Sequence, residues 1–199
     1  KYLFIYGPVL VNEAENVVMQ DTEIGMLPEE WDVLKIGEVY ELTRKPRNFE
    51  IAIDKVPFIP MEYIPDSKIY VERFDFKKPE EITSGTFFFK DDLLVAKITP
   101  SFENGKQCLT SNLPSNFGYA TTEVWPIHST ESTDILYLFY YLKNHVVRNI
   151  IANKMEGSTG RQRVPKNVLI EHKIPVPQIN IQKSISSMLK EIDYKIEAE

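Results

Sequence analysis

Apolar residues recur at helical spacing in two stretches of the chain. From residue 134 to 150 they return every three or four positions, which predicts an amphipathic helix capped by Ser132 or Thr133. A second stretch follows Pro177, with apolar spacings of 4, 3, 4 and 4 residues. Its seam consists of Ile181, Ile185, Met188, Ile192 and Ile196. The repeat predicts a helix that is either the start of a coiled coil or packed on its own domain, and its amphipathic character favours a partner helix.

The middle of the chain alternates apolar and polar residues in short runs instead. Residues 56–89 are broken repeatedly by proline, which predicts several short strands with tight connections. A turn at Asp91-Asp92 precedes a predicted buried strand over residues 93–98. The composition of residues 113–119 predicts a loop, and the alternation of residues 121–127 predicts a further strand. Together these patterns predict an α/β (α+β) fold, a curved mixed β-sheet with packed helices, followed by the start of a long coiled-coil-type helix.

The 199 residues suffice for one core rather than for two independent domains. We expect an N-terminal arm over residues 1–20, a globular domain over residues 21–177 and the final helix over residues 178–199. No apolar run approaches the roughly 18 residues that would cross a bilayer, and Lys1 to Tyr6 is too short for a secretory signal core, so we expect a cytoplasmic protein without membrane contact. Because the chain begins at Lys1 and ends within a predicted helix, we also expect a fragment.

Charge is distributed unevenly along the sequence. The net charge of −6 argues at first sight against a nucleic-acid partner. Residues 143–173, however, hold seven cations and two anions, a net charge of +5, so the remainder carries −11. This asymmetry predicts a protein with one phosphate-facing side and an acidic back, although a solvated basic face would have the same pattern.

The run Gly157-Ser158-Thr159-Gly160-Arg161-Gln162-Arg163-Val164-Pro165 is the most informative stretch. Its two glycines let backbone approach a ligand closely, and its arginines and glutamine offer forked donors. In the major groove, Arg can bond guanine bidentately and Gln can bond adenine in the same way. The run therefore predicts contact with DNA. A structural ion pair remains the alternative for each arginine, and a scaffold turn for the glycines.

In order and spacing, this run and several other segments resemble the specificity subunits of type I restriction-modification enzymes. The other segments are Leu93 to Pro100, Tyr119 to Glu123, Ile174 to Pro177 and Ile181-Gln182, with Glu23 to Trp31 as the lead-in. The resemblance spans residues 21–199. It implies a target recognition domain that reads one half of a bipartite DNA site, while helices hold the two halves apart and dock methyltransferase and restriction subunits.

Members of that family typically contain two recognition domains, whereas this chain has one and only the opening of a helix. The chain is then half of a subunit, a single-repeat form, or the recognition domain of a fused restriction-methylation enzyme. A second recognition domain or a homodimer through the C-terminal helix would complete it. The resemblance implies no catalytic residues and no cofactor, and we find no Asn-Pro-Pro-Tyr-like motif, no Gly-rich cofactor loop and no Walker motif.

The resemblance and the residue chemistry together define an expected interface with double-stranded DNA. Arg161, Gln162 and Arg163 would approach base edges or adjacent phosphates, and the loop after the buried strand would add second-tier contacts. The expected DNA-binding residues are Lys97, Thr99, Ser101, Asn104, Lys106, Gly157, Ser158, Thr159, Gly160, Arg161, Gln162, Arg163 and Lys166.

Two functions of other classes remain open at this point. Pro65-Asp66 followed by Asp75-Phe76-Lys77 superficially matches a metal-dependent nuclease, although the pattern is short and common. The single Cys108 and the scattered histidines predict no metal site. A protein-assembly module, in which the basic run binds an acidic partner and the final helix dimerises, would explain the charge but not the run from Gly157 to Pro165.

Overall fold

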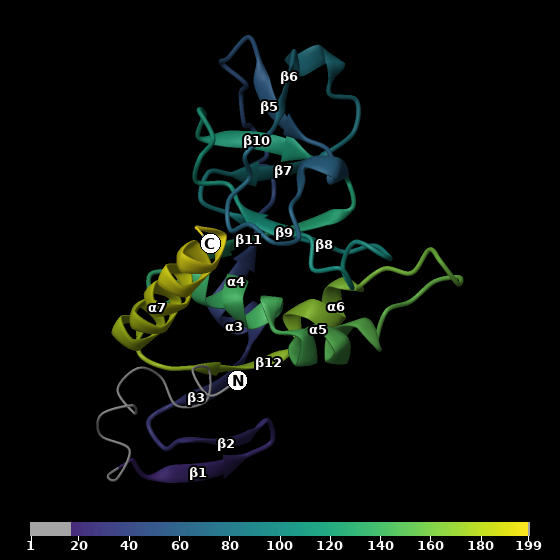
Figure 1. Ribbon diagram of the computed structural model, residues 1–199. Helices are drawn as coiled ribbons and strands as arrows, with labels where there is room; N and C mark the ends of the chain where they lie inside the picture. The colour runs from purple at the N-terminus through teal and green to yellow at the C-terminus, as the bar shows by residue number, and fades with distance from the viewer. Residues whose placement is uncertain (1–16, 199) are drawn as a thin grey trace.

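The computed structural model describes residues 17–198, and in this part of the chain two four-stranded sheets lie above a helical layer (Figure 1). The upper sheet has the order β6-β5-β10-β7 and is mixed, because β10 runs parallel to β5 while the other pairs are antiparallel. Its strands are β5 (Val56–Ile59), β6 (Asp75–Lys77), β7 (Thr86–Phe89) and β10 (Phe117–Ala120). The mixed sheet and packed helices confirm the predicted α/β class.

The second sheet has the order β4-β11-β8-β9 and is antiparallel throughout. Its strands are β4 (Tyr40–Leu42), β8 (Leu93–Ala96), β9 (Gln107–Leu109) and β11 (Val124–Ser129). One face packs against the upper sheet through Leu94, Cys108 and Val124, and the other packs on the helices through Leu93 and Ile127. The two apolar faces explain why β8 is buried along its whole length.

Strand β10 occupies part of the segment that the sequence predicts to be a loop. Residues 117–120 are all buried, and they pair with β5 on one side and β7 on the other. A β-carbon on Gly118 would lie 2.6 Å from the Phe88 ring, so glycine permits this close packing. The loop prediction holds for residues 113–116 and was wrong for residues 117–119, where pairing with the neighbouring strands, rather than local propensity, decides the conformation.

The expected single helix after residue 132 is divided in two, α4 (Ile135–Lys143) and α5 (His145–Ala152). The Asp134 carboxylate caps α4 by accepting from the Tyr137 N–H at 3.2 Å, and the Asn144 side chain caps α5. The predicted cap was therefore wrong: the Thr133 hydroxyl instead accepts from the Thr130 N–H at 2.8 Å.

A lower layer contains two short two-stranded sheets. Hairpin β1 (Met19–Thr22) with β2 (Gly25–Pro28) is the first of them, and β1 crosses the expected boundary after residue 20. Strand β3 (Asp32–Lys35) pairs with β12 (Lys173–Val176). The remaining elements are α3 (Ile36–Val39), α6 (Lys166–Ile170) and the 3-10 turns η1 (Met61–Tyr63) and η2 (Pro79–Glu81). Most of the expected N-terminal arm lies outside the described residues.

The C-terminal helix α7 (Ile179–Glu197) confirms the predicted long helix and packs against α4. Its first half belongs to the domain core, because Ile185 is 0% exposed and packs with Trp31 and Tyr137. Its second half projects apolar side chains into solvent, with Ile192 41% and Ile196 67% exposed. Ile185 therefore faces its own domain, whereas Ile192 and Ile196 are exposed, and a partner helix for them stays a prediction. Within residues 17–198, no helix is long and apolar enough to cross a membrane.

Candidate nucleic-acid interface

The loop of residues 156–163 extends away from the body of the molecule between α5 and α6 (Figure 1). At its base, Glu156 and Arg163 exchange backbone hydrogen bonds of 2.8 and 2.9 Å. Gly157 has φ +125°, and a β-carbon there would lie 2.8 Å from the Arg161 carbonyl oxygen. Gly157 is therefore required to close the loop, which supports the scaffold alternative for this glycine.

This loop and the segment after β8 lie side by side, although they are some sixty residues apart in the sequence. The Thr99 N–H donates to the Gln162 carbonyl at 2.9 Å, and the Val164 N–H donates to the Lys97 carbonyl at 2.8 Å. The structure thus brings together the two segments that the sequence nominates for DNA contact. Gln162 and Thr99 meet through their backbones, which leaves the Gln162 side chain free to point elsewhere.

Arg163 is held in a two-pronged ion pair with Glu123. Its Nε and Nη2 donate to the two carboxylate oxygens at 2.9 and 2.8 Å. The hydrogen bonds from Arg163, together with its charge, hold the pKa of Glu123 below its ordinary value. Glu123 precedes β11, so the pair ties the loop to the second sheet. For Arg163 the structural ion pair is therefore the arrangement present.

Lys97 stacks on this same cluster rather than extending into solvent. Its ammonium lies 4.2 Å from the centroid of the Trp125 ring, and the Trp125 indole N–H donates to the Val164 carbonyl at 3.2 Å. Burial lowers the pKa of Lys97, while the nearby Glu123 charge opposes that shift. Lys97, Glu123, Trp125 and Arg163 together form the support of the loop.

The tip of the loop is different in character. Ser158, Thr159, Gly160 and Arg161 are exposed, and no side chain among them has a hydrogen bond or ion pair within residues 17–198. The Arg161 N–H donates to the Ser158 carbonyl at 2.9 Å, which forms the turn at the tip. An arginine and two hydroxyls at the end of a supported loop are suited to an external acceptor.

Some of the residues expected to make second-tier DNA contacts already have hydrogen-bond partners inside the protein, and others do not. The Thr99 hydroxyl donates to Glu103 at 2.7 Å, and the Lys106 ammonium donates to the Met61 carbonyl at 3.0 Å. Asn104 is exposed at the loop end, and Ser101 is half-buried with its carbonyl accepting from the Lys106 N–H at 3.0 Å. Of this set, Asn104 is the side chain best placed to meet a ligand.

Residues 28–199 match the family described as the Type I restriction modification DNA specificity domain. The chain belongs to that family. The specificity domain is 31% identical over 166 residues to the type I restriction enzyme EcoAI specificity subunit of Escherichia coli, a match that covers 80% of this chain and 27% of that subunit. It is 26% identical over 200 residues to the type I restriction enzyme MjaVIII specificity subunit of Methanocaldococcus jannaschii, covering 92% of this chain and 44% of that subunit.

The fold of the specificity domain also occurs in a solved structure. The crystal structure of the HsdS subunit from Thermoanaerobacter tengcongensis aligns with a TM-score of 0.62 at 16% identity, over 91% of this chain and 41% of that chain. The chain therefore spans less than half the length of these relatives. Both curated relatives are named as specificity subunits of type I restriction enzymes.

The basic run of the specificity domain is less available than its sequence indicates. Arg148 donates to the Lys143 carbonyl at 2.6 Å, and Lys143 lies 3.5 Å from the Asp193 carboxylate on α7. Lys173 pairs with Glu23. Together with Arg163, four of the seven cations thus have internal partners. Within the described residues, no ion pair engages the other three cations, which are Lys154, Arg161 and Lys166.

Sequence reasoning missed a second basic segment, the turn of residues 43–49 between β4 and β5, which we call the basic turn. It contains Arg44, Lys45 and Arg47 and no acidic residue. Arg44 lines a hollow of about 290 Å³ together with Lys166 at the start of α6. Three cations within four positions are a signal that the charge count over residues 143–173 did not include.

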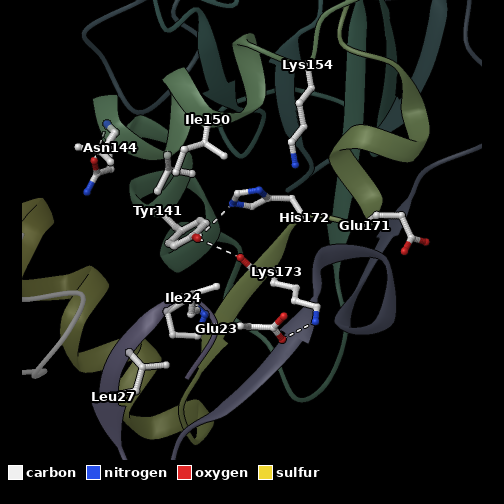
Figure 2. Close-up of a pocket in the computed structure, with 13 residues that line it drawn as sticks. Glu23, Ile24, Leu27, Tyr141, Asn144, Ile150, Lys154, Glu171, His172 and Lys173 are labelled. Atoms are coloured by element: carbon white, nitrogen blue, oxygen red, sulfur yellow. Dashed lines mark hydrogen bonds and ion pairs between the residues drawn. The ribbon is translucent and has the colours of Figure 1, made fainter. Parts of the chain in front are cut away.

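A hollow of about 560 Å³ lies elsewhere in the specificity domain, between hairpin β1–β2, α5 and β12 (Figure 2). Figure 2 shows the Tyr141 hydroxyl between the His172 ring and the Lys173 carbonyl, at 3.2 and 3.1 Å. Burial, followed by the charge of Lys154, lowers the pKa of His172 to about 4. The hollow shares no lining residue with the 156–163 loop and is not part of the candidate interface.

Two of the three charged residues nominated for a nuclease, Asp75 and Lys77, have structural contacts. The Lys77 ammonium lies 3.6 Å from the centroid of the Phe58 ring, and Asp75 accepts from the Tyr63 hydroxyl at 3.4 Å. Among residues 17–198, no cluster of three acidic, histidine or cysteine side chains could hold a metal. Cys108 is buried, and burial raises the pKa of its thiol to about 12.

Proposed function

We propose that this specificity domain reads one half of a bipartite DNA target through the tip of the 156–163 loop. The observation that carries the proposal is the contrast within that loop: Arg163 is engaged with Glu123, whereas Arg161 is exposed and has no partner in the described chain. A supported loop with a free forked donor at its tip suits the edge of a base pair, as with Arg on guanine. Ser158 and Thr159 would donate to the flanking phosphates.

The relatives support this assignment through their length and names. Each is a specificity subunit of a type I restriction enzyme, and this chain spans 27% to 44% of its length. A single recognition domain of that size accounts for half a target. The other half would be read by a second recognition domain or by a second copy of this chain. The assembly would act in the cytoplasm, where the host DNA lies.

The exposed end of α7 favours a second role, the docking of partner subunits. Ile192, Tyr194 and Ile196 project from the last three turns of the helix and are 41%, 47% and 67% exposed. Ile192 and Ile196 are four positions apart and so share one face of the helix, and exposed apolar residues on one face are typical of a helix that packs against another helix. We propose that this half of α7 contacts a spacer helix or a methyltransferase subunit.

A loop exchange tests the proposed reading of DNA. The 156–163 loop is replaced by the corresponding loop of a family member with a different target, within the full specificity subunit, and the methylated sites are mapped by sequencing. We expect the base preference to change in one half-site and to stay the same in the other. Unchanged methylation sites in a folded, active assembly would refute the loop as the reading element.

A further inference from the structure

The basic turn presents three cations without internal partners. Arg44, Lys45 and Arg47 are all exposed, and no ion pair engages any of them within residues 17–198. The Lys45 ammonium lies 5.9 Å from the centroid of the Tyr119 ring, a loose contact that leaves the charge in solvent. The turn differs in this respect from the run at residues 143–173, where three of the seven cations have ion pairs within the described residues and Arg148 donates to a backbone carbonyl.

The basic turn is anchored at both ends, so its cations are held in place before any ligand arrives. At its start, the Thr43 N–H donates to the Pro126 carbonyl of β11 at 3.0 Å. At its end, the Phe49 ring meets the rings of Phe87 and Phe117 edge-on, at centroid distances of 5.0 and 4.8 Å. A turn fixed in this way loses little conformational entropy on binding.

The basic turn and the 156–163 loop are joined through the second sheet. Arg44 follows Leu42 by two positions and so lies on the face of β4 that also carries Tyr40 and Leu42, the face that lines the hollow with Lys166. Leu42 pairs with Ile127 and the Thr43 N–H donates to the Pro126 carbonyl, and if this register continued by one residue it would bring Arg44 opposite Trp125. Trp125 in turn contacts Val164 and Lys97 at the loop base.

One carboxylate reduces the positive charge of this region. Glu41 lines the same hollow as Arg44 and Lys166 and is exposed. Two cations therefore face one anion in the hollow itself, and Lys45 and Arg47 add two further cations on the turn. The local balance remains positive although the whole chain has a net charge of −6.

We propose that the basic turn binds the phosphate backbone of the duplex whose bases the 156–163 loop reads. This inference rests on the proposed function, since the same duplex must lie against both elements. Exposed Arg and Lys side chains that do not contact base edges bind phosphates irrespective of the DNA sequence. Such phosphate contacts fix the register of a protein on DNA. The basic turn then supplies affinity and position, and the loop tip supplies discrimination.

The test removes the three charges in the full specificity subunit, assembled with its methyltransferase partner. Arg44→Gln, Lys45→Gln and Arg47→Gln are combined, and affinity is measured against salt concentration for a cognate duplex and a scrambled duplex. Each neutralised phosphate contributes about −0.9 to the slope of log affinity against log salt. We expect the slope to become shallower by about 2 to 3, and both duplexes to weaken by the same factor.

Two control variants match this triple change. The first combines Arg73→Gln, Lys78→Gln and Lys183→Gln, which removes three exposed cations that have no ion pair within residues 17–198 and do not line the hollow with Arg44. Its slope should equal that of the unmodified protein. The second, Arg44→Lys with Arg47→Lys, keeps the charge and should keep the slope, which separates loss of charge from damage to the fold.

The outcomes separate this inference from the function on which it rests. An unchanged slope for the charge-removing variant, in a protein that still prefers the cognate duplex, would overturn the phosphate role and leave the loop assignment intact. Weakening of the cognate duplex alone would also overturn it, because the turn would then read bases. A protein without any preference for the cognate duplex would contradict the proposed function itself.

Discussion

The Arg163 guanidinium and the Glu123 carboxylate are joined by two hydrogen bonds of 2.8 and 2.9 Å. The pair links the end of the 156–163 loop to the residue that precedes β11, which is paired with β8 in the second sheet. The two neighbouring arginines therefore differ: Arg163 is held by Glu123, whereas Arg161 is exposed and is the one that we propose contacts DNA. Four predictions follow this division between supporting and contacting residues.

Arg161→Ala should weaken binding of the cognate duplex by about 1 to 3 kcal/mol and relax discrimination at one base pair, because the forked donor is lost. Competition binding with a set of single-base variants of the half-site measures both effects. Asn112→Ala, outside the expected interface, provides a comparison with another exposed polar side chain and should leave binding unchanged. Equal affinity of Arg161→Ala for every duplex would show that Arg161 contacts no base.

Glu123→Gln should loosen the loop without removing any group that touches DNA. Because Arg163 lowers the pKa of Glu123, the ion pair is intact above the ordinary glutamate pKa of 4.5 and is lost as the pH falls through the lowered value. The protection factors of the bonded amides of Glu156, Arg161 and Arg163, corrected for the intrinsic exchange rate at each pH, should therefore fall at acid pH in the native protein and already be low at neutral pH in the variant. Slow exchange in Glu123→Gln at neutral pH would contradict the supporting role.

Ile185→Ala should lower the stability of the domain, whereas Ile196→Ala should weaken association with partner subunits, although both residues belong to one apolar seam. Ile185 is 0% exposed, so its truncation should lower the free energy of unfolding by about 2 to 5 kcal/mol. Ile196 is 67% exposed, so its truncation should leave unfolding nearly unchanged and instead weaken association with partner subunits. Urea unfolding and analytical ultracentrifugation of the assembly measure the two effects.

His172 should make the domain less stable in mild acid. Burial lowers its pKa from 6.5 to about 4, so between these values the unfolded chain binds a proton that the folded chain does not. Stability should fall as the pH drops from about 6.5 to 4, by up to about 3 kcal/mol from this residue. His172→Gln should flatten the pH dependence of urea unfolding, and an unchanged profile would rule out the buried neutral ring.

Part of the fold was predictable from local pattern. Residues 93–96 form a strand because a continuous apolar run suits a strand that is buried on both faces. The predicted turn before this strand is confirmed: Asp91 has φ +71°, and the Asp92 carboxylate accepts from the Phe89 N–H at 2.9 Å. Local pattern failed at residues 117–120, where pairing with β5 and β7 makes a strand from a loop-like composition. It also failed at Asn144, where a side-chain cap divides one apolar period into two helices.

The sequence by itself determined the family, the class of fold and the two segments that meet in the candidate interface, because motifs, apolar periods and turn residues act over a few positions of chain. Only the tertiary structure decided which cations remain free. Ion pairs such as Arg163 with Glu123 form between residues forty positions apart, and the basic turn is placed beside Lys166 by strand register. Charge along a chain is a local property, whereas neutralisation depends on which side chains folding brings within a few ångströms of each other.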